Sequence, residues 1–109
     1  MNKRLYEMHA SVCAALGNGK RIQIIDLLRD GEKTAGALTR EMNIPKANLS
    51  QHLQIMKSKG IVLSRREGVS IYYRIANPKI VSACQLMRDV LMEQLDDAAK
   101  LREEYAQVR

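Results

Sequence analysis

A tight turn in the middle of the chain, Asn43-Ile44-Pro45, constrains the fold more than any other feature of the sequence. Pro45 fixes its own φ and pushes Ile44 out of the α region, so one helix must end before the turn and another can begin after it. Thr34 is a suitable N-cap for a short helix over residues 35–42. The turn therefore predicts two short helices held close together, as in a helix-turn-helix unit.

The helix after the turn has one buried face. Leu49, Leu53 and Met56 recur at helical spacing, and Gly60 marks the end of a helix that runs from about Lys46 to Lys59. The solvent-facing side of this helix carries amide and hydroxyl groups, whereas most surface helices favour Glu, Lys and Ala on that side. The N-terminal half of this helix is therefore suited to form hydrogen bonds with a binding partner.

The hydrophobic pattern changes after Gly60. The segments "IVLSRR" and "VSIYYRI" are rich in β-branched and aromatic residues, and Glu67-Gly68 joins them, which predicts a β-hairpin. A hairpin directly after a helix-turn-helix makes a winged helix. The residues expected to pack inward from the hairpin are Ile61, Leu63, Ile71 and Tyr73.

Helical spacing of apolar residues predicts further helices on both sides of this unit. One runs from about Leu5 to Gly17, a second ends at Asp30-Gly31, and a long last helix begins at Asn77-Pro78. We expect a single, mainly α domain over residues 1–109 with a β-hairpin wing, in the order α-α-α-α-β-β-α. The charged segment 96–109 should extend the last helix or fray. The apolar stripe of that helix comprises Ile80, Cys84, Met87, Leu91 and Leu95.

Basic residues are concentrated in the predicted winged helix. The chain has a formal net charge of +6, and residues 46–74 contain six basic residues against the single acid Glu67. A concentrated basic zone suits a phosphate backbone, because each neutralised phosphate releases counterions. A merely solvated basic face is the plainer interpretation. The six basic residues are Lys46, Lys57, Lys59, Arg65, Arg66 and Arg74.

The outward side of the helix after the turn favours DNA over plain solvation. On a helical wheel Ala47, Gln51 and Gln54 point away from the buried face. Asn and Gln read adenine, Ser reads a base or a phosphate, and a small methyl can meet thymine. A recognition helix enters the major groove, and a basic hairpin tip contacts the backbone or a minor groove. The predicted DNA-binding residues are Lys46, Ala47, Asn48, Ser50, Gln51, His52, Gln54, Arg65, Arg66 and Ser70.

Other classes of protein are disfavoured. No apolar run approaches the roughly 20 residues of a membrane span, and the stretch from Ala10 to Leu16 is too short and too interrupted for a signal peptide. We therefore expect a cytoplasmic protein. Without a Gly-rich phosphate loop, paired-carboxylate motif or nucleophile elbow, we expect neither an enzyme nor a cofactor. A winged helix that binds protein is the remaining competitor, and steep salt dependence would distinguish DNA binding from it.

Three segments resemble the ArsR/SmtB family of bacterial winged-helix repressors: "ALGNGKRIQIIDLL", "NLSQHLQIMKSKGIV" and "SRREGVSIYYRI". The resemblance implies a homodimer formed by the first and last helices, a palindromic operator of double-stranded DNA, and release when an inducer binds. In this alignment Ser50, Gln51 and His52 match the reading-helix positions, and residues 65–70 match the wing.

Two metal sites known in that family are absent by residue identity. Members that bind metal or arsenite at the third helix carry C-x-C there, whereas this chain has Thr34, Ala35 and Gly36. Members that bind zinc across the last helices supply Asp and His ligands. The matching residues here are Asn77, Lys79, Val90 and Glu93. The resemblance therefore leaves the inducer unknown.

The two cysteines, Cys13 and Cys84, are the remaining candidates for sensing an inducer. They form no C-x-x-C motif, so they can be reduced, buried thiols that only fill core. If the first and last helices pack together, they can instead form a switch that responds to oxidant or reactive sulfur. A third interpretation is a thiophilic metal or metalloid site that adds His9, which shares a helix face with Cys13.

Overall fold

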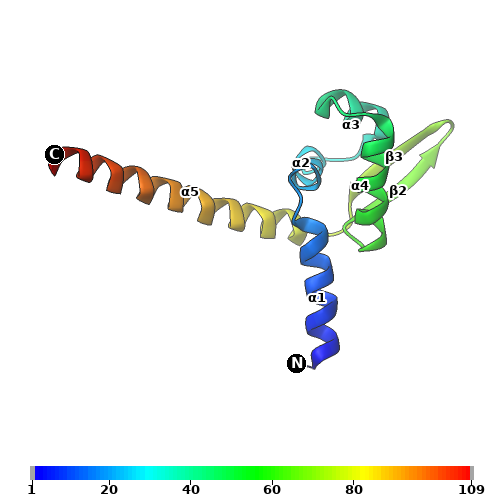
Figure 1. Ribbon diagram of the computed structural model, residues 1–109. Helices are drawn as coiled ribbons and strands as arrows, with labels where there is room; N and C mark the ends of the chain where they lie inside the picture. The colour runs from blue at the N-terminus through cyan, green and yellow to red at the C-terminus, as the bar shows by residue number, and fades with distance from the viewer. Residues whose placement is uncertain (1, 109) are drawn as a thin grey trace.

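The computed structural model describes residues 2–108, and the side chains of residues 2–107. Helices precede a β-hairpin, and a long helix follows it (Figure 1), so the predicted winged-helix order is confirmed. The elements are α1 (Lys3–Leu16), α2 (Gly19–Leu27), β1 (Lys33–Thr34), α3 (Ala35–Met42), α4 (Lys46–Ser58), β2 (Val62–Glu67), β3 (Ser70–Ile75) and α5 (Pro78–Val108).

Side chains cap the helices where the sequence suggested. Thr34 Oγ1 accepts a hydrogen bond from the backbone nitrogen of Ala37 at 3.1 Å, and Asn77 Oδ1 accepts one from Lys79 at 2.9 Å. The predicted cap at Thr34 is therefore confirmed, and Asn77 caps the last helix where the sequence predicted that helix to begin. Asn43 ends α3 in the left-handed conformation, with φ 53°, which Asn tolerates better than most residues. This residue turns the chain so that α4 can start at Lys46.

The core is built almost entirely from the segment between the end of α1 and the start of the wing. Leu49, Leu53 and Met56 are buried, so the predicted inner face of α4 is confirmed. Apolar side chains of α5 are only half-buried against this core. The buried residues are Ala15, Ile24, Ile25, Leu28, Leu38, Met42, Leu49, Leu53, Met56, Ile61 and Val62.

The sheet has one strand more than the sequence predicted. β1 pairs with β3, with Lys33 opposite Tyr73 and Thr34 opposite Tyr72, so the strand order is β1-β3-β2. A strand of two residues is too short to show an alternating pattern. The hairpin turn is also one residue later than expected. Glu67 still pairs with Ser70, and Gly68-Val69 forms the loop, with Gly68 at φ 60°.

The inward face of the wing differs from the expected one. Ile61 is buried, but Leu63 and Ile71 are exposed. Leu63 lies opposite Arg74, on the outer face of the hairpin, because Val62 rather than Leu63 points into the core. Ile71 lies opposite Arg66 on the inner face, but near the wing tip, beyond the reach of the core. The expectation that Leu63 and Ile71 pack inward was therefore wrong.

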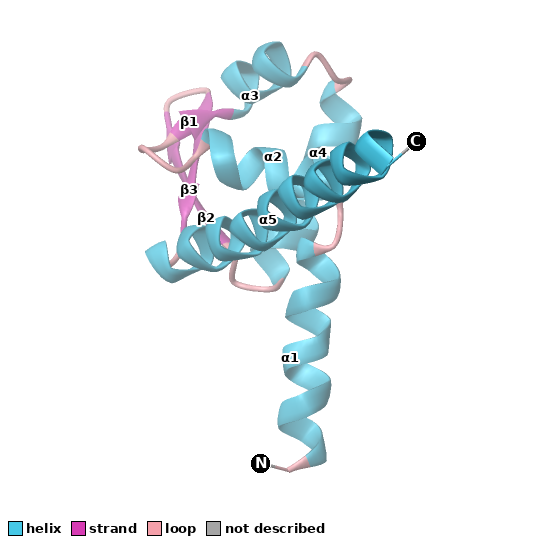
Figure 2. Ribbon diagram, turned by 90° about the vertical axis from the view of Figure 1, so that its left-hand side faces the viewer, coloured by secondary structure: helices cyan, strands magenta, loops and turns pink. Residues whose placement is uncertain are grey.

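Helices α1 and α5 project from the winged-helix body in different directions (Figures 1 and 2). The molecule measures 65 × 42 × 23 Å as a result. α5 continues as helix through the charged extension to Val108. Its described side chains are exposed beyond Arg88, and among residues 2–108 no helix is both long and apolar enough to cross a bilayer.

Candidate nucleic-acid interface

The outer side of α4 presents a row of uncharged hydrogen-bonding groups. Ser50, Gln51 and Gln54 are exposed, as are Lys46 and Ala47 at the start of the helix. The burial of Leu49 and Leu53 turns these side chains away from the core. The structure therefore brings together five of the seven α4 residues that the sequence suggested for DNA contact.

The other two, Asn48 and His52, are half-buried and turned toward α2. Lys20 Nζ donates to Asn48 Oδ1 at 3.1 Å, and Arg21 Nε donates to His52 Nδ1 at 3.1 Å. Arg21 also donates to the backbone carbonyl of Ala15, at 3.1 Å. These bonds attach one side of α4 to α2 and to the end of α1.

The bond from Arg21 sets the chemistry of His52. Because Nδ1 accepts a hydrogen bond, the proton of the neutral ring must lie on Nε2. Burial, followed by the positive charges of Arg21 and Lys20, lowers the pKa of His52 below its ordinary value of 6.5. His52 therefore keeps a neutral ring whose free edge is a hydrogen-bond donor.

On the wing, Arg65 is bound to carboxylates of its own chain. Its Nε donates to Glu32 at 3.0 Å and its Nη1 donates to Glu67 at 2.7 Å. Its guanidinium also lies 4.4 Å from the centroid of the Tyr72 ring. The hydrogen bond from Arg65 lowers the pKa of Glu32. Arg65 therefore links the wing to the loop after α2.

Arg66 lies on the other face of the hairpin. It is opposite Ile71 and shares that face with Tyr73, which packs against the core beside α4. Arg66 has no hydrogen-bond or ion-pair partner among the side chains of residues 2–107. Ser70 is half-buried at the tip, opposite Glu67. Arg66 is therefore a wing cation that remains available to a ligand.

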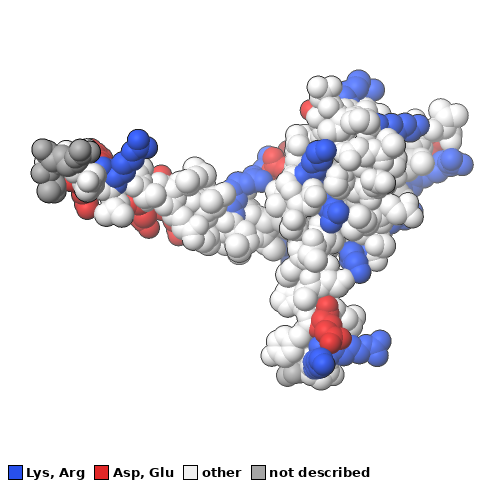
Figure 3. Space-filling view, in the orientation of Figure 1, with Lys and Arg blue, Asp and Glu red and all other residues white. Residues whose placement is uncertain are grey.

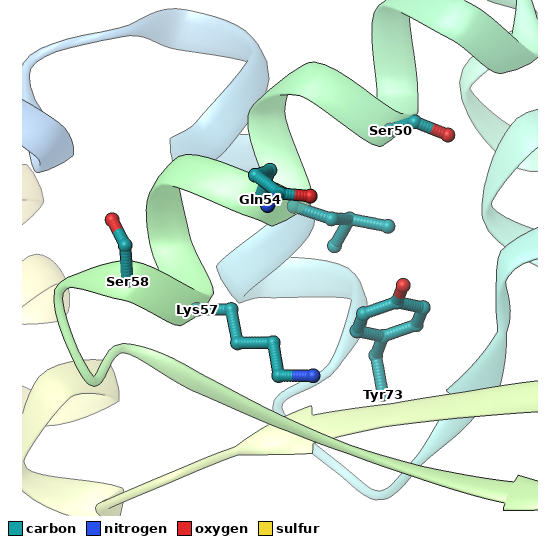
Figure 4. Close-up of a pocket in the computed structure, with 6 residues that line it drawn as sticks. Ser50, Gln54, Lys57, Ser58 and Tyr73 are labelled. Carbon is teal, nitrogen blue, oxygen red and sulfur yellow. The ribbon is translucent and has the colours of Figure 1, made fainter.

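A hollow of about 420 Å³ lies between α4 and β3. Figure 4 shows Lys57 extending from α4 toward the ring of Tyr73, whose hydroxyl points back toward the helix. The buried Leu53 supplies an apolar part of the lining, and no carboxylate lines the hollow. The lining residues are Ser50, Leu53, Gln54, Lys57, Ser58 and Tyr73.

Charge is divided between the body and the projecting helix. In Figure 3 the Lys and Arg side chains are spread over the winged-helix body, and several Asp and Glu side chains lie along the outer part of α5. A polyanion would therefore be attracted to the body and repelled from the end of α5.

The thiols occupy different environments. Cys13 on α1 is exposed, together with His9, and this contradicts the interpretation that Cys13 fills core. Cys84 on α5 is half-buried against the core, and its burial raises the pKa of the thiol. Both are free. Among the side chains of residues 2–107, no group of three His, Cys, Asp or Glu residues is placed to hold a metal ion.

Sequence reasoning missed four residues of this interface. In the sequence, Lys57 stands out only as part of the basic zone, and Tyr73 only as a residue expected to pack inward. Lys20 and Arg21 lie 28 and 31 residues from their partners on α4, so only the fold brings them together. The adjacent positive charges at the start of α2 were the one available signal.

Comparisons with known proteins agree on one family. The model for the family described as bacterial regulatory protein, arsR family, matches residues 18–64. The chain is 32% identical over 101 residues to the HTH-type transcriptional regulator Rv0081 of Mycobacterium tuberculosis, covering 92% of this chain and 89% of that one. The crystal structure of Rv0081 has a TM-score of 0.81, with coverage of 90% and 99%.

A second solved structure is the homodimeric winged helix-turn-helix DNA-binding domain Mb0332 of Mycobacterium bovis. It is 37% identical, has a TM-score of 0.79, and covers 89% of this chain and 93% of that one. The regulator Rv0324 of M. tuberculosis is 40% identical over 95 residues, or 87% of this chain, but the match spans only 42% of its length.

The relatives include both a repressor and an activator. The transcriptional repressor SdpR of Bacillus subtilis is 37% identical over 65 residues, covering 60% of this chain and 72% of that one. The transcriptional activator HlyU of Vibrio cholerae is 29% identical over 73 residues, covering 67% and 68%. The protein belongs to the arsR family of bacterial regulatory proteins and is a winged-helix, DNA-binding transcriptional regulator.

Proposed function

We propose that this chain is a homodimeric repressor that reads a palindromic operator with two copies of α4 and holds the backbone with its wings. The observation that carries the proposal is the exposed row of Ser50, Gln51 and Gln54 on α4. Lys57 lines a hollow with two of these residues, and Arg66 lies on the face of the wing that carries Tyr73. Neutral donors and acceptors read base edges, whereas cations hold phosphates. Residues 1–109 then form one DNA-binding and dimerisation domain, with residues 96–109 as an extension.

The test is a duplex selected from a random library by the wild-type protein. Gln51→Ala should weaken binding to this selected duplex by about 1–3 kcal/mol and relax base preference at one position of each half-site, as expected for a lost base contact. Gln107→Ala, at the far end of α5, is the matched control. If Gln51→Ala keeps wild-type affinity and preference, α4 does not read the bases through this face.

We propose repression rather than activation. Two relatives named as repressors, SdpR at 37% and the biofilm growth-associated repressor of Agrobacterium fabrum at 35%, have higher identity than the activator HlyU at 29%. A protein that covers its operator also blocks polymerase without needing any further contact. A reporter gene placed behind the selected duplex should be expressed less when the wild-type protein is present. Increased expression would reverse the assigned sign.

We further propose that an inducer acts through the thiols. Cys13 is exposed to reagents on α1, and Cys84 lies where α5 meets the core. A bond between them would change how α1 and α5 pack, and that packing would set the separation of the two reading helices. Peroxide or polysulfide would accept the two electrons released when two thiols join, and two protons would leave.

Cys13→Ser and Cys84→Ser should each bind the selected duplex like wild type but lose release by peroxide or polysulfide. Titrations with and without reagent, repeated after reduction, measure this effect. Release of both variants to the wild-type extent would show that the inducer acts elsewhere. A disulfide requires Cα atoms no more than about 7 Å apart, whereas a polysulfide bridge spans more, so comparing the two reagents reports the separation.

A further inference from the structure

The hollow between α4 and β3 has the chemistry of an anion site. Its polar lining consists of hydroxyl, amide and ammonium groups, and no carboxylate is present. Ser58 donates its hydroxyl proton to the Ile55 carbonyl at 2.7 Å, so it is already engaged. Lys57 and Tyr73 have no hydrogen-bond or ion-pair partner among the side chains described. An ammonium and a phenol that face one hollow without a protein acceptor favour a ligand that supplies acceptors.

The position of the hollow indicates which anion it would receive. Ser50 and Gln54 line it and also belong to the exposed row of α4, so the hollow opens beside the surface that would meet bases. Arg66 lies on the same face of the wing as Tyr73. An anion here would have the reading helix on one side and the wing on the other. A DNA backbone phosphate beside the major groove satisfies these conditions.

We propose that this hollow seats one backbone phosphate in each half-site, held by the Lys57 ammonium and the Tyr73 hydroxyl. The inference rests on the proposed DNA-reading function and deepens it. Both groups donate, and phosphate oxygens only accept, so each contact is a charge-assisted hydrogen bond. Because the two donors come from different elements, the phosphate would fix the position of α4 relative to the wing and hence the register of α4 on the bases.

The experiment replaces single phosphates of the selected duplex, one position at a time, by neutral methylphosphonate. One position per half-site should weaken wild-type binding about tenfold. Lys57→Gln should weaken binding to the unmodified duplex by a similar factor. Methylphosphonate at the critical position should not weaken the binding of this variant further, because the substitution and the modified phosphate remove the same contact. Tyr73→Phe should bind the unmodified duplex about threefold more weakly and should also be insensitive to methylphosphonate at the critical position. Because the aromatic ring is kept, this variant should have the thermal stability of the wild type.

Lys59→Gln is the matched control, since Lys59 follows α4 outside the hollow. It should remain sensitive at the critical position. If Lys57→Gln and methylphosphonate reduce affinity independently at every position, so that their fold-losses multiply, Lys57 does not contact any of these phosphates. The proposed phosphate site would then be wrong, although DNA binding itself would stand. If the wild type binds no duplex, the proposed function fails with it. A response of Lys57 and Tyr73 to inorganic phosphate, without the position-specific effect in DNA, would also overturn the seat in favour of a small-anion site.

Discussion

Burial and a hydrogen bond from one arginine together hold the histidine of α4 in its neutral state. Arg21 donates to Nδ1 of His52, and this bond exists only while the ring is neutral. Protonation would replace an acceptor by a donor that faces Arg21 and Lys20, and these positive charges already oppose it. Arg21 therefore acts as a positioning residue for α4, and its second bond reaches the Ala15 carbonyl at the end of α1.

The lowered pKa of His52 predicts a loss of stability in weak acid. The unfolded chain takes up a proton near pH 6.5, but the folded chain does so only at lower pH. Stability is therefore fully present above 6.5 and is lost as the pH falls through the folded pKa. In thermal unfolding, wild type should lose more stability over this range than His52→Gln, whose amide oxygen can accept from Arg21 without titrating. Parallel pH profiles would contradict the prediction.

At the scale of elements, the wing is held by an ion pair that reaches across the fold. Arg65 and Glu32 are 33 residues apart, and their bond connects β2 to the loop before β1. Tyr72 supports the guanidinium from the neighbouring strand. Two adjacent arginines therefore have different tasks. Arg65 attaches the wing to the body, and Arg66 on the opposite face has no hydrogen-bond or ion-pair partner among the side chains of residues 2–107.

Salt titration should separate these two arginines. Arg66→Ala should weaken binding to all sequences alike and reduce the slope of log affinity against log salt by about 1, as for a lost phosphate contact. Arg65→Ala should leave the slope unchanged and weaken binding at least as much as Glu32→Gln does, because it also removes the bond to Glu67 and the contact with Tyr72. A reduced slope for Arg65→Ala but not for Arg66→Ala would exchange their roles.

At the scale of the whole molecule, the projecting helices expose more apolar surface than a monomer of this size keeps in water. Met87 is 68% exposed and Leu91 52% exposed on α5, and Leu5, Tyr6 and Met8 are exposed on α1. A second copy related by a two-fold axis would cover the same faces on both chains. Two reading helices would then meet two half-sites, which a single winged helix cannot do.

We therefore predict a dimer in sedimentation at micromolar concentration. Leu91→Glu should shift the equilibrium toward monomer, because the interface would then bury two unpaired carboxylates. Leu101→Glu introduces the same charge in the charged extension and should leave the dimer intact. A wild-type monomer would refute the dimer. If Leu101→Glu also dissociates it, the extension belongs to the interface.

The sequence alone determined the features that depend on neighbours along the chain. The caps at Thr34 and Asn77 act on nitrogens two or three residues away, and the turn at Pro45 depends on the stereochemistry of its own ring. The inner face of α4 follows from a helical period that repeats every few residues. Because these interactions are local, the winged-helix order could be predicted without knowing how the elements pack.

Only the tertiary structure decided the features that depend on distant partners. Strand β1 exists because β3 offers it hydrogen bonds. In β2, packing against the core determines that Val62 points inward and Leu63 outward, and the alternating pattern alone does not specify which of the two faces is buried. Asn48 and His52 have the same polar character as Gln51 and Gln54, but α2 engages the first pair and leaves the second exposed. Likewise Arg65 differs from Arg66 because Glu32, Glu67 and the Tyr72 ring lie within its reach. Residue type specifies which bonds a side chain can make, and the fold determines which partner is near enough to make them.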